Sequence, residues 1–281
     1  MPTTYAHWVF GRKCIEKMPD NLQDIIHANR DIYNQGVHGP DLLFYDLADS
    51  KVSNYGYQMH HIPARDFFAK CKVAYKEHAE KDQMLAYILA FLTHFALDSQ
   101  IHSYVERKIE ESDISHNHIE AQWDRHKMEL DNRVPNLVDR SEALKPTKKN
   151  SKIIAYFFPF NQKTIYKSMK MHKFIVKLAN AVSPKKQAAF QKGLRFIKQN
   201  NNADLFIGFE EDPICKDSNL RMDKLEAKAL KLFPKLLNNL LNYFDDKEEL
   251  DKYFEHDFEV WPDYKKIPVL PYEDELTFKV K

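Results

Sequence analysis

Glycine is scarce in this sequence: only six of its 281 residues are glycine. Proteins with many tight β-turns need more, because glycine adopts left-handed backbone angles at no steric cost. The phosphate-binding patterns GxxxxGK[ST] and GxGxxG are also absent from the sequence. Leucine, lysine, alanine and glutamate, which favour helices, are abundant. The composition therefore predicts an all-α fold.

Cysteine is equally sparse. Cys14, Cys71 and Cys215 are odd in number, widely spaced and form no CxxC pair. We interpret them as reduced thiols rather than as a disulfide framework. The first residues contain no apolar stretch of signal-peptide length. These features predict a cytoplasmic protein.

Long hydrophobic runs are missing as well. The longest one, Met84–Leu97, is shorter than the roughly 20 residues that cross a bilayer, and it contains His94. We therefore expect no transmembrane segment and interpret this run as part of a buried core helix.

An excess of charge of either sign is lacking. The chain has 42 Lys and Arg against 41 Asp and Glu, a net charge of +1. Proteins that bind polyanions usually carry a clear basic excess. No nucleic-acid partner is therefore expected.

Apolar residues recur at helical spacing along most of the chain. Asp20, Asp82 and Ser115 stand where helix N-caps are expected. Pro63 suits the first turn of a helix, and Gly36 suits a helix end. These signals predict helices over Tyr5–Lys17, Asn21–Asn34, Ala64–Glu80, Asp82–Arg107, Ser115–Leu130, Thr164–Val182, Lys185–Gln199 and Arg221–Phe244.

A basic, polar stretch at Arg140–Lys152 is the best candidate for an internal boundary. It predicts a helical core over residues 1–145 and a helical C-terminal extension over residues 146–281, packed on that core. The tail from Phe258 contains three prolines. We expect this tail to be irregular and to pack back on the body of the protein.

Histidine is concentrated in one half of the chain, because eleven of the thirteen histidines lie at or before His126. His94, Asp98 and His102 follow one another at steps of four within or just after the most apolar helix, so they share one stripe. Burying two imidazoles and a carboxylate is costly unless a cation compensates. A metal site is therefore favoured over a hydrogen-bonded polar stripe.

Other candidate ligands are weak one by one. His116 and Glu120 have helical spacing, which also suits a surface contact, and Asp41 follows Gly39 and Pro40 in a rigid turn. His7 lies in the first predicted helix. His60 and His61 stand side by side in a segment that resembles a loop, and spacing does not decide between them.

Their order along the chain carries more information than any single residue. A His is followed by Gly-Pro-Asp, then by His, then by HxxxDxxxH, and finally by HxxxE. Over roughly residues 5–130 this order resembles the zinc-dependent phospholipase C family and, more distantly, the single-strand-specific zinc nucleases that share its fold. The matching residues are His7, Asp41, His60, His94, Asp98, His102, His116 and Glu120.

The resemblance implies a multi-helix bundle of the zinc phospholipase C type with two or three zinc ions. One ion would be held by Asp41, His60, His94 and Asp98. A second would be held by His102, His116 and Glu120. Asp98 would bridge to a third ion near His7. The mixture of imidazole and carboxylate suits zinc on chemical grounds, and iron or manganese would also fit a set so rich in carboxylate.

The implied activity is hydrolysis of a phosphodiester, with a phospholipid or a smaller molecule as substrate. A metal-activated water would attack, Asp98 would set the spacing of the ions, and Asp41 would act as a ligand or a base. His38, His61, His118 and Asp124 could orient the ligands, although ordinary polar roles fit His118 and Asp124 better. Two alternatives remain: a nuclease on the same fold, and a non-catalytic helical metal-binding or regulatory protein.

Overall fold

The computed structural model of the chain describes residues 4–46, 49–179, 183–196 and 203–280. Within these ranges the fold is all-α and contains no β-strand, which confirms the predicted fold class. The α-helices of these ranges are α1 (Thr4–Ile15), α2 (Asp20–Ala28), α3 (Arg30–Gly36), α4 (Ser50–His60), α5 (Ala64–Glu77), α6 (Lys81–Ser112), α7 (His116–Leu130), α8 (Lys148–Ile154), α9 (Gln162–Leu178), α10 (Pro184–Phe196), α12 (Lys216–Phe244) and α13 (Tyr272–Thr277). Short 3-10 helices are η1 (Gly39–Leu43), η2 (Pro135–Leu137), η3 (Ala155–Phe157), η4 (Pro213–Cys215), η5 (Lys252–Glu255) and η6 (Tyr264–Lys266).

Helix α6 runs through the core, and nearly every residue from Met84 to Val105 is buried. Its length and composition would allow it to cross a membrane, but 94% of its most apolar 18-residue stretch is buried inside the protein. The predicted core helix is therefore present. It ends at Ser112, where Asp113 adopts a left-handed conformation with φ 54°.

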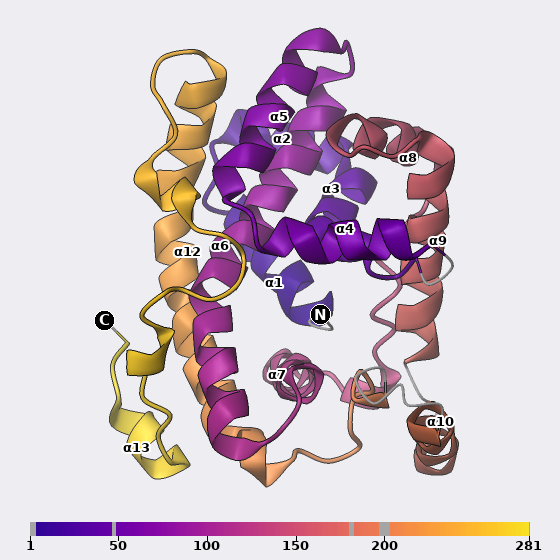
Figure 1. The fold of residues 1–281 in the computed structure, drawn as a ribbon, viewed down its shortest axis with the longest axis vertical. Helices are drawn as coiled ribbons and strands as arrows, with labels where there is room; N and C mark the ends of the chain where they lie inside the picture. Colours follow the sequence, from indigo (N-terminus) through magenta and orange to yellow (C-terminus); the bar gives the residue numbers. More distant parts are fainter. Residues whose placement is uncertain (1–3, 47–48, 180–182, 197–202, 281) are drawn as a thin grey trace.

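The other helices pack around α6. Helices α3 and α12 make its most extensive contacts, and α1, α2, α5 and α7 also lie against it. Figure 1 shows α12 running beside α6, α4 crossing the molecule near its centre, and α8, α9 and α10 following one edge. Helix α6 is thus the central helix, and the N-terminal helices α1, α2 and α3 lie against it.

Four predicted segments differ from the structure. Helix α8 begins inside the polar stretch Arg140–Lys152 that was predicted as a boundary, and helix α13 lies in the tail that was predicted to be irregular. The helix predicted over Asn21–Asn34 is divided into α2 and α3, because Asn29 between them has non-helical backbone angles. The segment before His60, predicted to resemble a loop, is helix α4, whose first turn is capped by the Asp49 carboxylate accepting from the N–H of Lys51. The buried residues of α4 are Val52, Gly56, Met59 and His60.

The remaining helix predictions hold within a few residues. Gly36 ends α3, Ala64 begins α5 directly after Pro63, and the Ser115 hydroxyl caps α7 by accepting from the N–H of His118. The helices predicted over Thr164–Val182 and Lys185–Gln199 correspond to α9 and α10. Residues 180–182 and 197–199 of those predictions lie outside the described residues.

The C-terminal helices share the hydrophobic core of the N-terminal half, which extends from Ala6 to Phe258. Helix α12 is joined to α6 by Lys108, whose Nζ lies 2.6 Å from Asp217 Oδ2. It is joined to α13 by the buried pair of Arg221 and Glu275. The C-terminal helices and the N-terminal half therefore share one hydrophobic core.

Candidate metal centre

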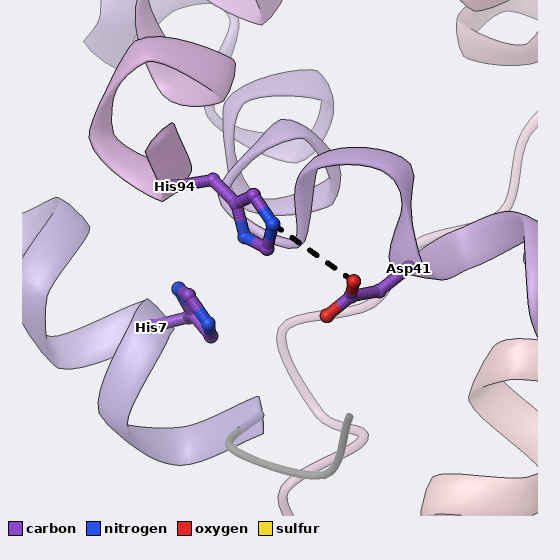
Figure 2. A group of neighbouring side chains, drawn as sticks. All are labelled: His7, Asp41 and His94. Carbon is purple, nitrogen blue, oxygen red and sulfur yellow. Dashed lines mark ion pairs between the residues drawn. The ribbon is translucent and has the colours of Figure 1, made fainter. Parts of the chain in front are cut away.

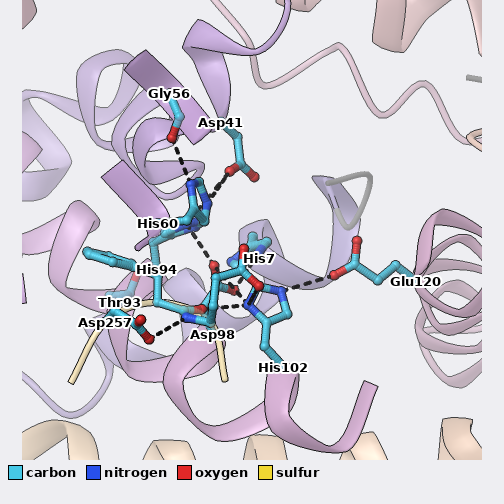
Figure 3. A network of polar contacts seen from close by, with 12 residues as sticks. His7, Asp41, Gly56, His60, Thr93, His94, Asp98, His102, Glu120 and Asp257 are labelled. Carbon is cyan, nitrogen blue, oxygen red and sulfur yellow. Dashed lines mark hydrogen bonds and ion pairs between the residues drawn. The ribbon is translucent and has the colours of Figure 1, made fainter. Parts of the chain in front are cut away.

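Helix α6 carries three candidate ligands on one buried stripe. His94, Asp98 and His102 are each at most 1% exposed. His94 Nε2 lies 2.9 Å from Asp98 Oδ2, and His102 Nδ1 lies 4.0 Å from the same oxygen. The stripe predicted from the spacing is thus present, with the carboxylate between two imidazoles (Figure 3).

Helix α1 and the Gly-Pro-Asp turn of η1 add two side chains. The His7 ring stacks on the His94 ring with centroids 4.5 Å apart, and His7 Nε2 lies 3.2 Å from Asp98 Oδ1. Asp41 Oδ1 lies 3.8 Å from His94 Nε2. Figure 2 shows His7, Asp41 and His94 facing one another from three separate elements.

The last residue of α4, His60, completes this group. Its Nδ1 donates to the carbonyl oxygen of Gly56 at 2.9 Å, so its Nε2 faces Asp41 Oδ1 at 3.1 Å. A neutral imidazole would point a lone pair at that carboxylate, and the contact becomes favourable when a cation or a proton lies between them. His61 is exposed, so the structure brings His60 rather than His61 into the cluster.

Helix α7 supplies a second group of donors. Glu120 is completely buried, and its Oε1 lies 3.0 Å from His116 Nε2 and 3.4 Å from His102 Nε2. His116 begins α7, and its side chain is 29% exposed. Among the eight predicted ligands it is the one that reaches solvent most.

The C-terminal tail forms one wall of the site, a role that the sequence does not reveal. Phe258 is completely buried, and its ring packs against His60 and His94 with centroids 5.9 and 6.0 Å away. Its carbonyl accepts from His102 Nδ1 at 2.6 Å, which directs His102 Nε2 toward Glu120. Glu259 Oε2 lies 3.8 Å from His102 Nδ1. In the sequence, the only indication of this role is an aromatic residue in a tail that is predicted to pack back on the body of the protein.

Many buried polar atoms in this cluster have no hydrogen-bond partner among the described residues. Such atoms are rare in folded proteins, because each one has lost its water without compensation. A bound cation would be ligated by one ring nitrogen of each histidine and by carboxylate oxygens, so the residues present fit a metal centre. The atoms are both ring nitrogens of His7 and His94, both carboxylate oxygens of Asp98, Asp41 Oδ1, His60 Nε2, His116 Nε2 and Glu120 Oε2.

The carboxylates of the cluster remain ionised despite their burial. Burial raises the pKa of Asp98, but the histidines beside it, His94 foremost, outweigh this effect and hold the pKa well below its usual range. The pKa of Asp41 is likewise lowered, because His94 and His60 outweigh burial. Burial also opposes ionisation of Glu120, yet His116 and His102 lower its pKa. The three buried carboxylates are therefore negatively charged and lie beside imidazoles, an arrangement that suits the binding of cations.

The donor atoms gather into three sets, in each of which they lie within 4.8 Å of one another. His102, His116 and Glu120 form one set, in agreement with the predicted second site. The predicted first site is represented by His60, His94 and Asp98, with Asp41 directly beside His60. The third set joins His7 to Asp41 and His94, whereas the resemblance connects His7 with Asp98. All eight predicted residues therefore lie in one cluster.

The residues considered as orienting groups take different places. His38 is buried and meets His172 edge to face, with ring centroids 5.0 Å apart. His118 Nε2 lies 2.9 Å from Asp212 Oδ2, away from the donor sets. Asp124 accepts from the N–H groups of Tyr5 and Ala6 at 3.1 and 2.8 Å. It therefore fixes the start of α1, the helix that carries His7.

Replacing Gly39 should disturb both the fold and the site. Gly39 has φ +50°, and an added Cβ would lie 2.2 Å from Cδ2 of His94. Gly39→Ala is expected to lower the free energy of unfolding by roughly 2–4 kcal/mol and to weaken the binding of a metal ion by the cluster, because the backbone is strained and the His94 ring must move. Chemical denaturation and zinc titration measure the two effects.

Gly193→Ala is the matched control, because no atom lies within 4 Å of its added Cβ and Gly193 lies inside helix α10. Alanine there should stabilise the protein by roughly 0.5–1 kcal/mol. Unchanged stability and zinc affinity in Gly39→Ala would show that the turn does not position His94.

Asp124 should give the stability a measurable pH dependence. Burial raises its pKa to about 6, although Arg140 and two backbone N–H groups oppose the rise. The folded-state pKa lies above the unfolded value of 3.8, so the associated stability is present at low pH and is lost as the pH rises through about 6. Relative to Asp124→Asn, the wild-type protein should lose roughly 2–3 kcal/mol between pH 4 and pH 7. Denaturation of both proteins in chelator tests this, and parallel pH profiles would contradict it.

Comparison with family models, with curated proteins and with solved structures finds no match for this chain. The chemistry of the cluster is therefore argued from its own residues.

Proposed function

We propose that this chain is a metal-dependent phosphoesterase, similar to zinc-dependent phospholipase C, that hydrolyses a phosphodiester with a metal-activated water. The observation that supports the proposal best is the convergence of eight histidine and carboxylate side chains from α1, η1, α4, α6 and α7. Their unpartnered buried atoms suit two or three divalent ions, with zinc as the preferred metal.

The ligand sets are those that the family resemblance implies, and the donor geometry differs from them for His7, whose set contains Asp41 and His94. Asp41, His60, His94 and Asp98 would hold one ion, His102, His116 and Glu120 a second, and His7 a third together with Asp98. Bound divalent ions lower the pKa of water and neutralise the charge that develops on phosphoryl oxygens. Asp98, surrounded by three imidazoles, would hold the two ends of the cluster at a fixed separation.

Asp41 is a ligand candidate that could also act as a base. His94 and His60 lower its pKa against the effect of burial, so it is ionised at neutral pH. An ionised carboxylate can accept the proton that the attacking water releases. Phe258 closes the cluster on the side of His60 and His94, which keeps bulk water from that end. The substrate would then approach from the side of His116, whose side chain reaches solvent.

A non-catalytic metal-binding or regulatory protein is the second candidate, and burial is the observation that favours it. Seven of the eight ligands are at most 4% exposed. Structural metal sites are coordinatively closed, whereas catalytic ones keep a position open for water. Which of the two functions applies therefore depends on whether water and substrate can reach the metal ions near His116.

Hydrolysis assays on the zinc-loaded full chain separate the two functions. The substrates are bis(p-nitrophenyl) phosphate and p-nitrophenyl phosphorylcholine, and chelator followed by added zinc tests the metal requirement. We expect hydrolysis that is abolished by Asp41→Asn and unaffected by Asp31→Asn, a change at an exposed position. Zinc binding without hydrolysis of either substrate would contradict the enzyme and support the second candidate.

A further inference from the structure

The near-zero net charge hides an uneven distribution of charge along the chain. Residues 143–203 contain 14 Lys and Arg and no Asp or Glu. The rest of the chain holds 28 Lys and Arg against all 41 Asp and Glu, a net charge of −13. Such separation of charge is typical of proteins that meet a polyanionic surface.

This basic segment forms α8, α9 and α10, which follow one edge of the molecule in Figure 1. On α9, Lys163, Lys167, Lys170 and Lys177 are exposed, and steps of three or four residues place them on one stripe. Of these, Lys167 pairs with Asp46. No ion pair with a carboxylate of the described residues is formed by Lys163, Lys170, Lys185, Lys186 or Lys192.

Large apolar side chains are exposed among these lysines. Phe174 and Leu178 on α9 are 59% and 42% exposed, and Phe190 and Phe196 on α10 are 42% and 89% exposed. Phe174 lies on the same stripe as the α9 lysines, four residues after Lys170. Helix α10 buries only Gln187 among its residues, so it protrudes from the body. Exposed phenylalanines in a basic setting mark an interaction surface.

We propose that the basic edge, defined here as the exposed Lys, Phe and Leu residues of α9 and α10, docks on an anionic phospholipid bilayer. The ammonium groups would meet the headgroup phosphates and carboxylates, while Phe174, Leu178, Phe190 and Phe196 enter the interfacial layer. Proteins that bind single-stranded nucleic acid typically do so in a positively charged groove that follows the sugar-phosphate backbone. The protruding α10 favours insertion into a bilayer surface instead.

Binding of the full, metal-loaded chain to vesicles tests this docking surface. Co-sedimentation compares phosphatidylcholine vesicles with vesicles that also contain phosphatidylserine. We expect the phosphatidylserine vesicles to bind at least about tenfold more tightly, and added salt to reduce that preference. Equal binding to both vesicle types would overturn the proposal.

Two double variants separate the charged and apolar contributions. Lys170→Glu with Lys186→Glu should weaken binding to the anionic vesicles at least about tenfold, and Phe174→Ser with Phe196→Ser should also weaken it several-fold. Lys231→Glu with Lys265→Glu reverses the same number of exposed charges on α12 and η6 and should leave binding unchanged. All these positions are exposed, so the fold should be retained, which circular dichroism checks.

Two further outcomes would overturn the proposal. The first is that the Lys170 and Lys186 pair has no larger effect than the control pair. The second is that the phenylalanine pair has no effect while a single-stranded oligonucleotide binds as tightly as the anionic vesicles, which would indicate a general polyanion surface. The readout is binding rather than hydrolysis, so the result is independent of the phosphoesterase proposal.

Discussion

Asp98→Asn is expected to remove at least one tightly bound metal ion per molecule and to lower phosphodiester hydrolysis by roughly 10²–10³-fold or more. Asp98 is completely buried, and its two oxygens face His7, His94 and His102. Asparagine has nearly the same shape, but it lacks the negative charge and offers one oxygen donor in place of two. Zinc content and initial rates of hydrolysis measure the two losses.

Asp82→Asn is the control for this substitution, because Asp82 lies on the same helix in an exposed position. It should change neither the zinc content nor the rate, and its effect on stability should stay within about 0.5 kcal/mol. If Asp98→Asn retained the full zinc content of the wild type, Asp98 would not be a ligand.

Phe258→Ala should lower the free energy of unfolding by roughly 3–5 kcal/mol, the cost of a cavity left by a completely buried aromatic ring. The cavity would open directly beside His60 and His94, the rings that Phe258 contacts. Looser ligands bind metal less well, so zinc affinity should fall roughly 10–100-fold. Chemical denaturation of the chelated protein and competitive zinc titration give the two values.

Phe174→Ala removes the same side chain from an exposed position, where Phe174 is 59% exposed. Its effect on stability should be within about 0.5 kcal/mol, with zinc affinity unchanged. Equal effects of the two substitutions would show that the tail does not support the centre.

The part of the site that lies on one helix could be predicted from the sequence. His94, Asp98 and His102 share a stripe because a step of four residues is close to one helical turn, whatever the rest of the fold does. His116 and Glu120 meet on α7 for the same reason. The all-α fold could likewise be predicted, because scarce glycine and apolar residues at helical spacing are properties of the whole sequence.

Contacts between distant elements could not be derived in this way. The approach of His7 and Asp41 to His94 depends on how α1 and η1 pack against α6. Only the family resemblance indicated that Asp41 lies near His94, and it connected His7 with Asp98 instead. The choice between His60 and His61 depended on where α4 ends, and α4 is a helix that was not predicted. A one-residue shift at a helix end turns a side chain by about 100°.

The contribution of the C-terminal tail was also beyond sequence reasoning. Phe258 and Glu259 lie in an irregular segment, so no periodicity assigns them a direction. Their contacts with His102 join residues more than 150 positions apart in the sequence. The basic segment can be counted in the sequence, but the exposure of the phenylalanines among its lysines is known only from the structure.

The metal content of the purified full-length protein tests the central claim most directly. Inductively coupled plasma mass spectrometry should find two or three equivalents of zinc, and chelator should lower the melting temperature by an amount that added zinc restores. A folded protein that contains no metal, and whose melting temperature does not respond to zinc, would contradict the proposed metal centre.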